Sequence, residues 1–183
     1  TYQAIEADET ATTQAVMIVG LVGLLAAIGA AISAVLANRA MAQTLPQLQE
    51  QLGELPFAIP QLSPLGAFLS ALLGAFLAWL VWSAMVYFIG TRLFGGQATF
   101  NEMLRLLGFA QAPRLLSALG FIPCVGALFS IAGWVWSSIT SYIAAKEGLD
   151  LDNGKTIATV IISFIGVIIV NLLFSMLFGL LSL

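Results

Sequence analysis

The sequence predicts an all-α fold, a polytopic membrane helical bundle with about five transmembrane helices. The first observation is composition: 60% of the 183 residues are hydrophobic and 8% are charged, whereas soluble domains carry about 25% charged residues. The second is two uncharged runs, 15–37 and 65–91, each longer than the roughly 20 residues that span a bilayer as helix. The third is the lack of the period-two alternation typical of membrane barrels. We therefore treat residues 1–183 as a single integral membrane domain.

Five helical segments are expected in chain order. The first covers 13–37 and the second 65–91, which is long enough to require a tilted helix. The third, 100–119, is the least apolar of the five. The fourth covers 125–145 and the fifth 156–183.

Residues 38–64 form an expected interfacial amphipathic loop between the first two spans. Thr44 is a candidate N-cap, with Pro46 in the first turn of a short helix. Prolines 56, 60 and 64 end that helix and prevent the second span from starting earlier in the chain. One apolar face of the helix would rest at headgroup level. The leucines of that face are Leu45, Leu48, Leu52 and Leu55.

Small residues recur every four positions on the first two helices. Such stripes allow close approach of helix backbones, which favours association in lipid. We expect them to pack helices inside the bundle, and docking of a partner helix is the alternative. The candidates are Gly23, Ala27 and Ala31 on the first helix and Gly66, Ser70, Gly74 and Ala78 on the second.

The third segment has a helix start that the sequence indicates directly. Thr99 and Glu102 form the S/T-x-x-E pattern of a capping box. Arg105 follows one turn later, so its side chain is expected to reach back to the interface rather than remain at bilayer depth.

The same segment is expected to be kinked or broken at Pro113. Proline donates no amide hydrogen, so the carbonyl of Phe109 loses its helical partner. An unsatisfied carbonyl in lipid costs several kcal/mol, and a new donor must therefore be supplied. The candidates are Gln111, Arg114, Ser117 or a neighbouring helix.

Two polar residues at membrane depth are candidate functional groups. Arg114 lies beside the break, and broken helices with a buried arginine occur where transporters bind anions. The plainer interpretation is that Arg114 reaches the far interface or caps carbonyls. Asn171, in the middle of the fifth helix, is explained by an interhelical hydrogen bond.

Four tryptophans lie well inside their predicted spans, although interfacial belts place tryptophan at the headgroups. Core packing is the default interpretation. A groove for a lipid, quinone or carotenoid is the alternative, and it needs no ligating histidine. The four are Trp79, Trp82, Trp134 and Trp136.

Several function classes are disfavoured by what the sequence lacks. The net charge of −3 provides no basic patch for nucleic acid. The chain has no histidine, and Cys124 is its one cysteine, so the usual metal, haem and iron–sulfur ligands are missing. We expect no catalytic residues, no metal and no required cofactor.

Basic residues predict the orientation. Arg92, Lys146 and Lys155 fall in loops on the side of the N-terminus, and Arg39 falls on the other side. Because basic loops face the cytoplasm, we expect a cytoplasmic N-terminus and an external C-terminus in the inner (plasma) membrane.

Three stretches carry a family resemblance: "TYQAIEADETATTQA" at 1–15, "GTRLFGGQATFNEMLRLLGFAQAPRLLSALGFIPCVG" at 90–126 and "LDLDNGKT" at 149–156. They resemble prokaryotic members of the YIP (Ypt/Rab-interacting protein) domain family over nearly the whole chain. The resemblance implies a five-helix integral membrane protein with a cytoplasmic N-terminus and no catalytic residues. Eukaryotic relatives contact small GTPases in vesicle traffic, but their "DLYGP"-type motif is absent here, so we do not transfer that role.

Together these observations predict a non-catalytic accessory or scaffold subunit that acts through helix packing. Its expected partners are membrane lipids and other transmembrane subunits, in a larger respiratory or photosynthetic bacterial membrane complex. A small transporter or lipid-handling permease built around Arg114 is one alternative. A membrane-trafficking adaptor, as in the eukaryotic relatives, is another.

Overall fold

A computed structural model describes residues 11–53, 61–121 and 125–181, and every regular element in these ranges is helical. The predicted all-α class is therefore confirmed. Four of the helices are long and apolar enough to cross a membrane, and the third predicted segment is divided into two ten-residue pieces. The elements are α2 (Ala11–Leu52), α3 (Pro64–Phe94), α4 (Phe100–Phe109), the 3₁₀ helix η1 (Ala112–Phe121), α5 (Gly126–Leu149) and α6 (Asn153–Leu181).

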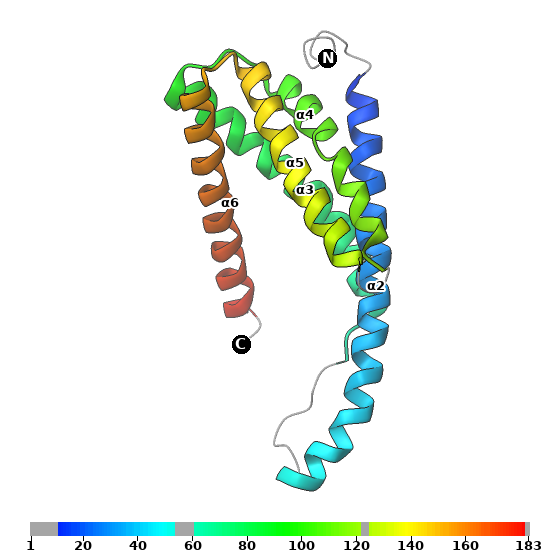
Figure 1. The fold of residues 1–183 in the computed structure, drawn as a ribbon. Coiled ribbons are helices and arrows are strands. Elements are labelled where there is room, and N and C mark those ends of the chain that lie inside the picture. The colour runs from blue at the N-terminus through cyan, green and yellow to red at the C-terminus, as the bar shows by residue number, and fades with distance from the viewer. Residues whose placement is uncertain (1–10, 54–60, 122–124, 182–183) are drawn as a thin grey trace.

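Successive segments run in opposite directions along the bundle (Figure 1). In that view α2 descends, α3 returns, α4 and η1 descend together, α5 returns and α6 descends. The first residue of α2 and the last turn of α6 therefore lie at opposite ends of the molecule. This alternation is the arrangement expected for five segments.

The helix α2 corrects the prediction of a separate helix starting at Thr44. The chain is one continuous helix of 42 residues through this point, and Pro46 lies inside it. The Thr44 hydroxyl donates back to the carbonyl of Ala40 (3.0 Å) instead of capping a new helix. The physical reason is cooperativity: the segment from Ala37 contains good helix formers, and extending a helix is easier than ending and renucleating it.

The length of α2 carries its end beyond the bilayer core. Forty-two residues rise roughly 63 Å, about twice the thickness of the hydrocarbon. Asn38 fixes this extension to the start of the next helix, because its amide donates to the Leu62 carbonyl (2.7 Å) and accepts from the Leu62 N–H (3.0 Å). The leucine face predicted for 45–55 lies partly outside the described residues and side chains.

The ends of α3 follow from local chemistry. Ser63 is the N-cap, and its hydroxyl accepts from the Gly66 N–H (3.1 Å), with Pro64 at the first helical position. Gly95 ends the helix in the left-handed conformation at φ 74°, a conformation that glycine adopts without steric cost.

The third segment is capped at its start and broken in its middle, as predicted. The Thr99 N–H donates to Glu102 Oε2 (2.7 Å) and the Thr99 hydroxyl accepts from the Glu102 N–H (3.3 Å), which completes the capping box. Regular α-helix ends at Phe109, and the 3₁₀ helix that follows contains Pro113 at its second position.

The fully buried core lies where α3, α4 and the C-terminal half of α5 meet. Gly148 allows α4 and α5 to approach closely, since a Cβ there would lie 3.2 Å from the Met103 sulfur. A backbone hydrogen bond joins the loop after α3 to the end of α5 here: the Gln97 N–H donates to the Leu149 carbonyl (3.0 Å). The buried cluster comprises Val86, Met103, Leu106, Leu107, Ala110, Ala144, Ala145, Leu149 and Leu151.

Candidate functional site

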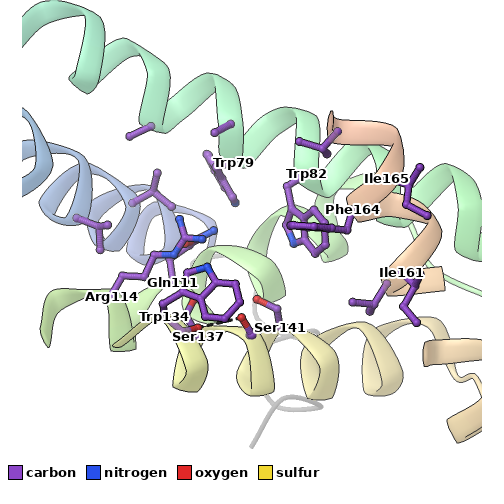
Figure 2. Close-up of a pocket in the computed structure, with 17 residues that line it drawn as sticks. Trp79, Trp82, Gln111, Arg114, Trp134, Ser137, Ser141, Ile161, Phe164 and Ile165 are labelled. Atoms are coloured by element: carbon purple, nitrogen blue, oxygen red, sulfur yellow. Dashed lines mark hydrogen bonds between the residues drawn. The ribbon is translucent and has the colours of Figure 1, made fainter. Parts of the chain in front are cut away.

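A cavity of about 460 Å³ lies between α3, the broken segment, α5 and α6. Figure 2 shows its two ends: Arg114, Gln111 and Trp134 lie at one, and Trp82 with Phe164 at the other. The volume falls within the range typical of small-molecule pockets, about 300–1,000 Å³. The site therefore has a polar end and an apolar end.

The polar end is a product of the helix break. The Arg114 N–H donates to the Gln111 carbonyl (2.9 Å), closing one 3₁₀ turn that brings both side chains to the cavity. Gln111 is 8% exposed, and its Oε1 has no hydrogen-bond partner among the described residues. Arg114 is exposed into this space. A cation and an amide thus face the same cavity.

Two hydroxyls of α5 satisfy a carbonyl that the break uncovers. Pro113 has no N–H to offer the Ala110 carbonyl, and the N–H of the following residue bonds elsewhere. Ser137 Oγ donates to the Ala110 oxygen at 3.0 Å. Thr140 Oγ1 lies at the same distance from that oxygen, and its single proton is shared with the carbonyls of Trp136 and Ser137 in its own helix (3.0 and 3.1 Å). The break thus also leaves the Ala110 carbonyl without a backbone donor, in addition to the predicted Phe109 carbonyl, and for Ala110 the neighbouring helix supplies hydroxyl donors.

Close packing of α5 on η1 depends on a glycine. A Cβ on Gly133 would lie 3.0 Å from the Pro113 carbonyl oxygen and 3.3 Å from Leu116 Cβ. Gly133, Ser137 and Ser141 repeat every four residues along α5 and are all buried. This small-residue face lets the irregular segment lie directly against the helix.

Trp79 holds the opposite wall of the cavity in place. It is 6% exposed, and its indole Nε1 donates to the Leu104 carbonyl of α4 (3.1 Å). The same nitrogen would lie 3.4 Å from a Cβ on Gly108, whose Cβ would also meet Ala15 of α2. The ring of Trp79 is therefore held against α4 by this hydrogen bond and lines the cavity from a fixed position.

The structure brings together five of the predicted groove and polar residues and separates the others. Trp136 is not among the residues that line the cavity. Arg105 is buried at 7% exposure in the second turn of α4, apart from the cavity. Asn171 lies on the exposed part of α6. The five that line the cavity or flank the break within it are Trp79, Trp82, Trp134, Gln111 and Arg114.

The two small-residue stripes have different environments. On α2, Gly23 and Ala27 are buried and Ala31 is half-buried, and a Cβ on Gly23 would lie 3.0 Å from Ala75 Cβ. On α3 the adjacent face, not the predicted stripe, turns toward α2. The exposed stripe, which differs from the expected internal packing, is Gly66, Ser70, Gly74 and Ala78.

Sequence reasoning missed the serines of α5 and the residues that α6 contributes. Ser137, Ser138 and Ser141 line the cavity. Three serines close together in an apolar helix could have indicated a face that turns toward protein or a cavity rather than lipid. Phe164 and Ile165 line it from α6, where they resemble the many other apolar residues of that helix. Among the described residues, no three histidine, cysteine or carboxylate side chains are grouped as metal ligands.

Comparison with known families gives one match, to the Yip1 domain over residues 1–176. Comparisons with curated proteins and with solved structures found no match. The match covers every residue that lines the cavity.

Proposed function

Because the chain belongs to the Yip1 domain family and is a multi-pass membrane protein, we propose that it is a non-catalytic accessory or scaffold subunit. It would bind a transmembrane helix of another subunit through the lipid-facing part of α6 around Asn171. The observation that carries this proposal is an exposed amide in an apolar helix: Asn171 is exposed, as are Ile168 and Leu172 on either side.

The amide of Asn171 has hydrogen-bonding capacity to spare. Its Nδ2 donates to the Val167 carbonyl of its own helix (2.9 Å), the one hydrogen bond of this side chain within the described part of the chain. A second N–H and the amide oxygen remain. Lipid tails cannot bond to either group, and polar side chains in membranes therefore favour contacts between helices.

The depth of Asn171 makes lipid exposure costly. A Cβ on Gly166 would lie 3.8 Å from the Met85 sulfur. Gly166 of α6 and Met85 of the antiparallel α3 therefore lie at the same height along the bundle. Five residues further along α6 is Asn171, and five residues back along α3 is Leu80. The midpoint of α3 (Pro64–Phe94) is residue 79, from (64 + 94)/2. Asn171 therefore lies about midway through the bilayer.

A second surface supports the same role. The exposed stripe of α3 is open at Gly74, where a Cβ would meet nothing within 4 Å, and small residues of this spacing allow a foreign helix to approach closely. Asn171 supplies the specific polar contact, and the stripe supplies space for a backbone.

Replacement of Asn171 tests the proposal. We expect Asn171→Leu to weaken association with the partner subunit by about 0.6–2 kcal/mol, the range for an interhelical hydrogen bond in a membrane, while the isolated protein remains folded. The measurement is quantitative mass spectrometry of subunits that co-purify with the tagged chain from native membranes in a mild detergent.

Leu172→Ala is the matched control, because it alters an exposed apolar residue beside Asn171 without changing a hydrogen bond. Full retention of every partner by Asn171→Leu would contradict the proposal, as would purification of the wild-type chain alone. A second copy of this chain as the partner would appear in the same experiment as cross-linking between differently tagged copies, and it would exclude the assignment to another subunit.

We further propose that the protein lies in the plasma membrane with its N-terminus in the cytoplasm. Arg92 and Lys146 are in the last turns of α3 and α5, and Lys155 is in the first turn of α6, at the end of the bundle where α2 begins (Figure 1). Arg39 is 28 residues into α2, roughly 42 Å away along the helix. This distribution of positive charge supports a cytoplasmic position for the first end.

Cysteine accessibility tests this orientation. In a Cys124→Ser background, an impermeant thiol reagent applied to intact cells is expected to label Arg39→Cys but to label Lys155→Cys only after permeabilisation. Labelling of Lys155→Cys alone in intact cells would reverse the orientation.

A further inference from the structure

The cavity of Figure 2 places an unbalanced positive charge next to apolar space. No ion pair of Arg114 is recorded with any carboxylate of the described residues, and its backbone N–H and carbonyl bond to Gln111 and Ser117. Removing a guanidinium from water at membrane depth costs a few kcal/mol or more. An anion bound in the cavity would balance this charge, and guanidinium groups pair with carboxylate and phosphate through two parallel hydrogen bonds.

Gln111 gives an independent indication of a polar ligand. Its side chain is more than nine-tenths buried and lines the same cavity, and Oε1 has no hydrogen-bond partner within the described ranges of the chain. A buried unsatisfied amide is destabilising by about 1–3 kcal/mol, and such groups in native proteins call for a specific explanation. Because rotation about the last torsion exchanges its oxygen and nitrogen, this amide can either accept from a ligand hydroxyl or donate to a ligand oxyanion.

The opposite end of the cavity suits hydrocarbon. Trp82, Phe164, Ile161 and Ile165 line this end (Figure 2). The ring of Trp79 lies between this end and the pair of Arg114 and Gln111. The lining therefore changes from cationic to aromatic and aliphatic along the length of the cavity, which is the pattern of an amphipathic molecule.

From this arrangement we propose that the cavity binds a single-chain anionic amphiphile. Its oxyanion, a carboxylate or a phosphate, pairs with Arg114 and bonds to Gln111, and its hydrocarbon chain lies between Trp79, Trp82 and Phe164. A volume of about 460 Å³ accommodates one chain rather than the two chains and headgroup of a phospholipid. The charge selects an anion over a neutral quinone or carotenoid. This site does not depend on the partner surface of α6.

Tryptophan quenching provides a direct measurement. The full chain carrying Trp136→Phe, which removes the tryptophan outside the cavity, is reconstituted in nanodiscs of a zwitterionic diacyl lipid. The probes are a stearate brominated in the middle of its chain, the matching lysophosphatidylglycerol, and the matching neutral monoacylglycerol. We expect saturable quenching by one or both anionic probes, at concentrations where the neutral probe gives only the linear quenching of a bulk lipid.

Substitutions at the polar end should alter affinity without removing the cavity. Loss of a charge-assisted hydrogen bond predicts that Arg114→Gln weakens binding of the anionic probe roughly ten- to hundredfold. Gln111→Leu, which removes a neutral hydrogen bond, should weaken it about two- to tenfold. Arg114→Lys keeps the charge but loses the planar fork, so its affinity should lie between those of wild type and Arg114→Gln.

Arg92→Gln is the matched control, because it removes the same charge from an exposed position at the end of α3 and should leave affinity unchanged. Size-exclusion profiles establish that each variant is folded, and Arg114→Lys and Gln111→Leu keep the test independent of the stability of Arg114→Gln. Equal saturable binding of the neutral probe would overturn the proposal. So would unchanged anion affinity in Arg114→Gln, or linear quenching by every probe. If stearate alone or the phosphate probe alone saturates, the headgroup is identified as a carboxylate or a phosphate.

Discussion

Combining Ser137→Ala with Thr140→Val is expected to destabilise the fold by several kcal/mol, far more than either substitution alone. Both hydroxyls lie within hydrogen-bond distance of the Ala110 carbonyl oxygen, and Pro113 removes the N–H that would otherwise serve it. With both gone, a carbonyl buried at membrane depth has no donor, a state that costs several kcal/mol. With one gone, the other hydroxyl remains, so each single variant should lose only about 0.5–1.5 kcal/mol.

The excess of the double variant over the sum of the singles is therefore the informative quantity. It can be measured by reversible unfolding in mixed micelles, followed by far-ultraviolet circular dichroism. Ser138→Ala is the matched control, because that hydroxyl bonds only within its own helix, to the Trp134 carbonyl (2.9 Å). Additive losses in the double variant would show that another group satisfies the Ala110 oxygen.

The second large effect is expected at Gly90, where α3 meets the end of α5. A Cβ there would lie 2.8 Å from Leu149 Cδ2 and 3.2 Å from Leu149 Cγ. Leu149 is fully buried within the core cluster, so its side chain has little room to move away. Gly90→Ala should therefore lower the free energy of unfolding by about 1–3 kcal/mol through overpacking.

Gly74→Ala distinguishes overpacking from a general effect of substituting glycine in α3. A Cβ at Gly74 meets nothing within 4 Å, and alanine has the higher helix propensity, by up to about 1 kcal/mol. The isolated Gly74→Ala protein should therefore unfold at the same or a slightly higher denaturant concentration. If Gly74→Ala and Gly90→Ala lower the free energy of unfolding by the same amount, overpacking against Leu149 is not the cause.

Local sequence chemistry was sufficient to predict several details of the fold. The Thr99–Glu102 capping box depends on two residues three positions apart, and the stop before α3 depends on Ser63 and Pro64. The break at Pro113 follows from the missing N–H of one residue. The predictions of the capping box, of Pro64 before the second span and of the break succeeded because the interactions concerned lie within a single helical turn, whereas the Ser63 N-cap was found only in the structure.

Predictions that required a choice between neighbouring faces were weaker. Ala75 lies one position after Gly74 of the predicted α3 stripe, and because Gly23 of α2 packs against Ala75, the face of Ala75 turns inward instead of the predicted one. Thr44 and Pro46 form a plausible helix start in isolation, but a helix already running from Ala11 passes through them. Propensity at one residue is smaller than the cost of ending and restarting a long helix.

The sequence by itself determined that lipid is the solvent of most of this chain, that the chain is helical, and that the third segment breaks near Arg114. Only the tertiary structure decided which polar and aromatic residues share a site. Trp79 and Trp134 are 55 residues apart, and they meet Gln111 and Arg114 because Gly133 and Gly108 let the helices approach. Trp136, two residues from Trp134, does not line the cavity. In a lipid-exposed helix both faces are apolar, so hydrophobic periodicity gives no indication of which face turns inward, and packing at small residues makes that choice.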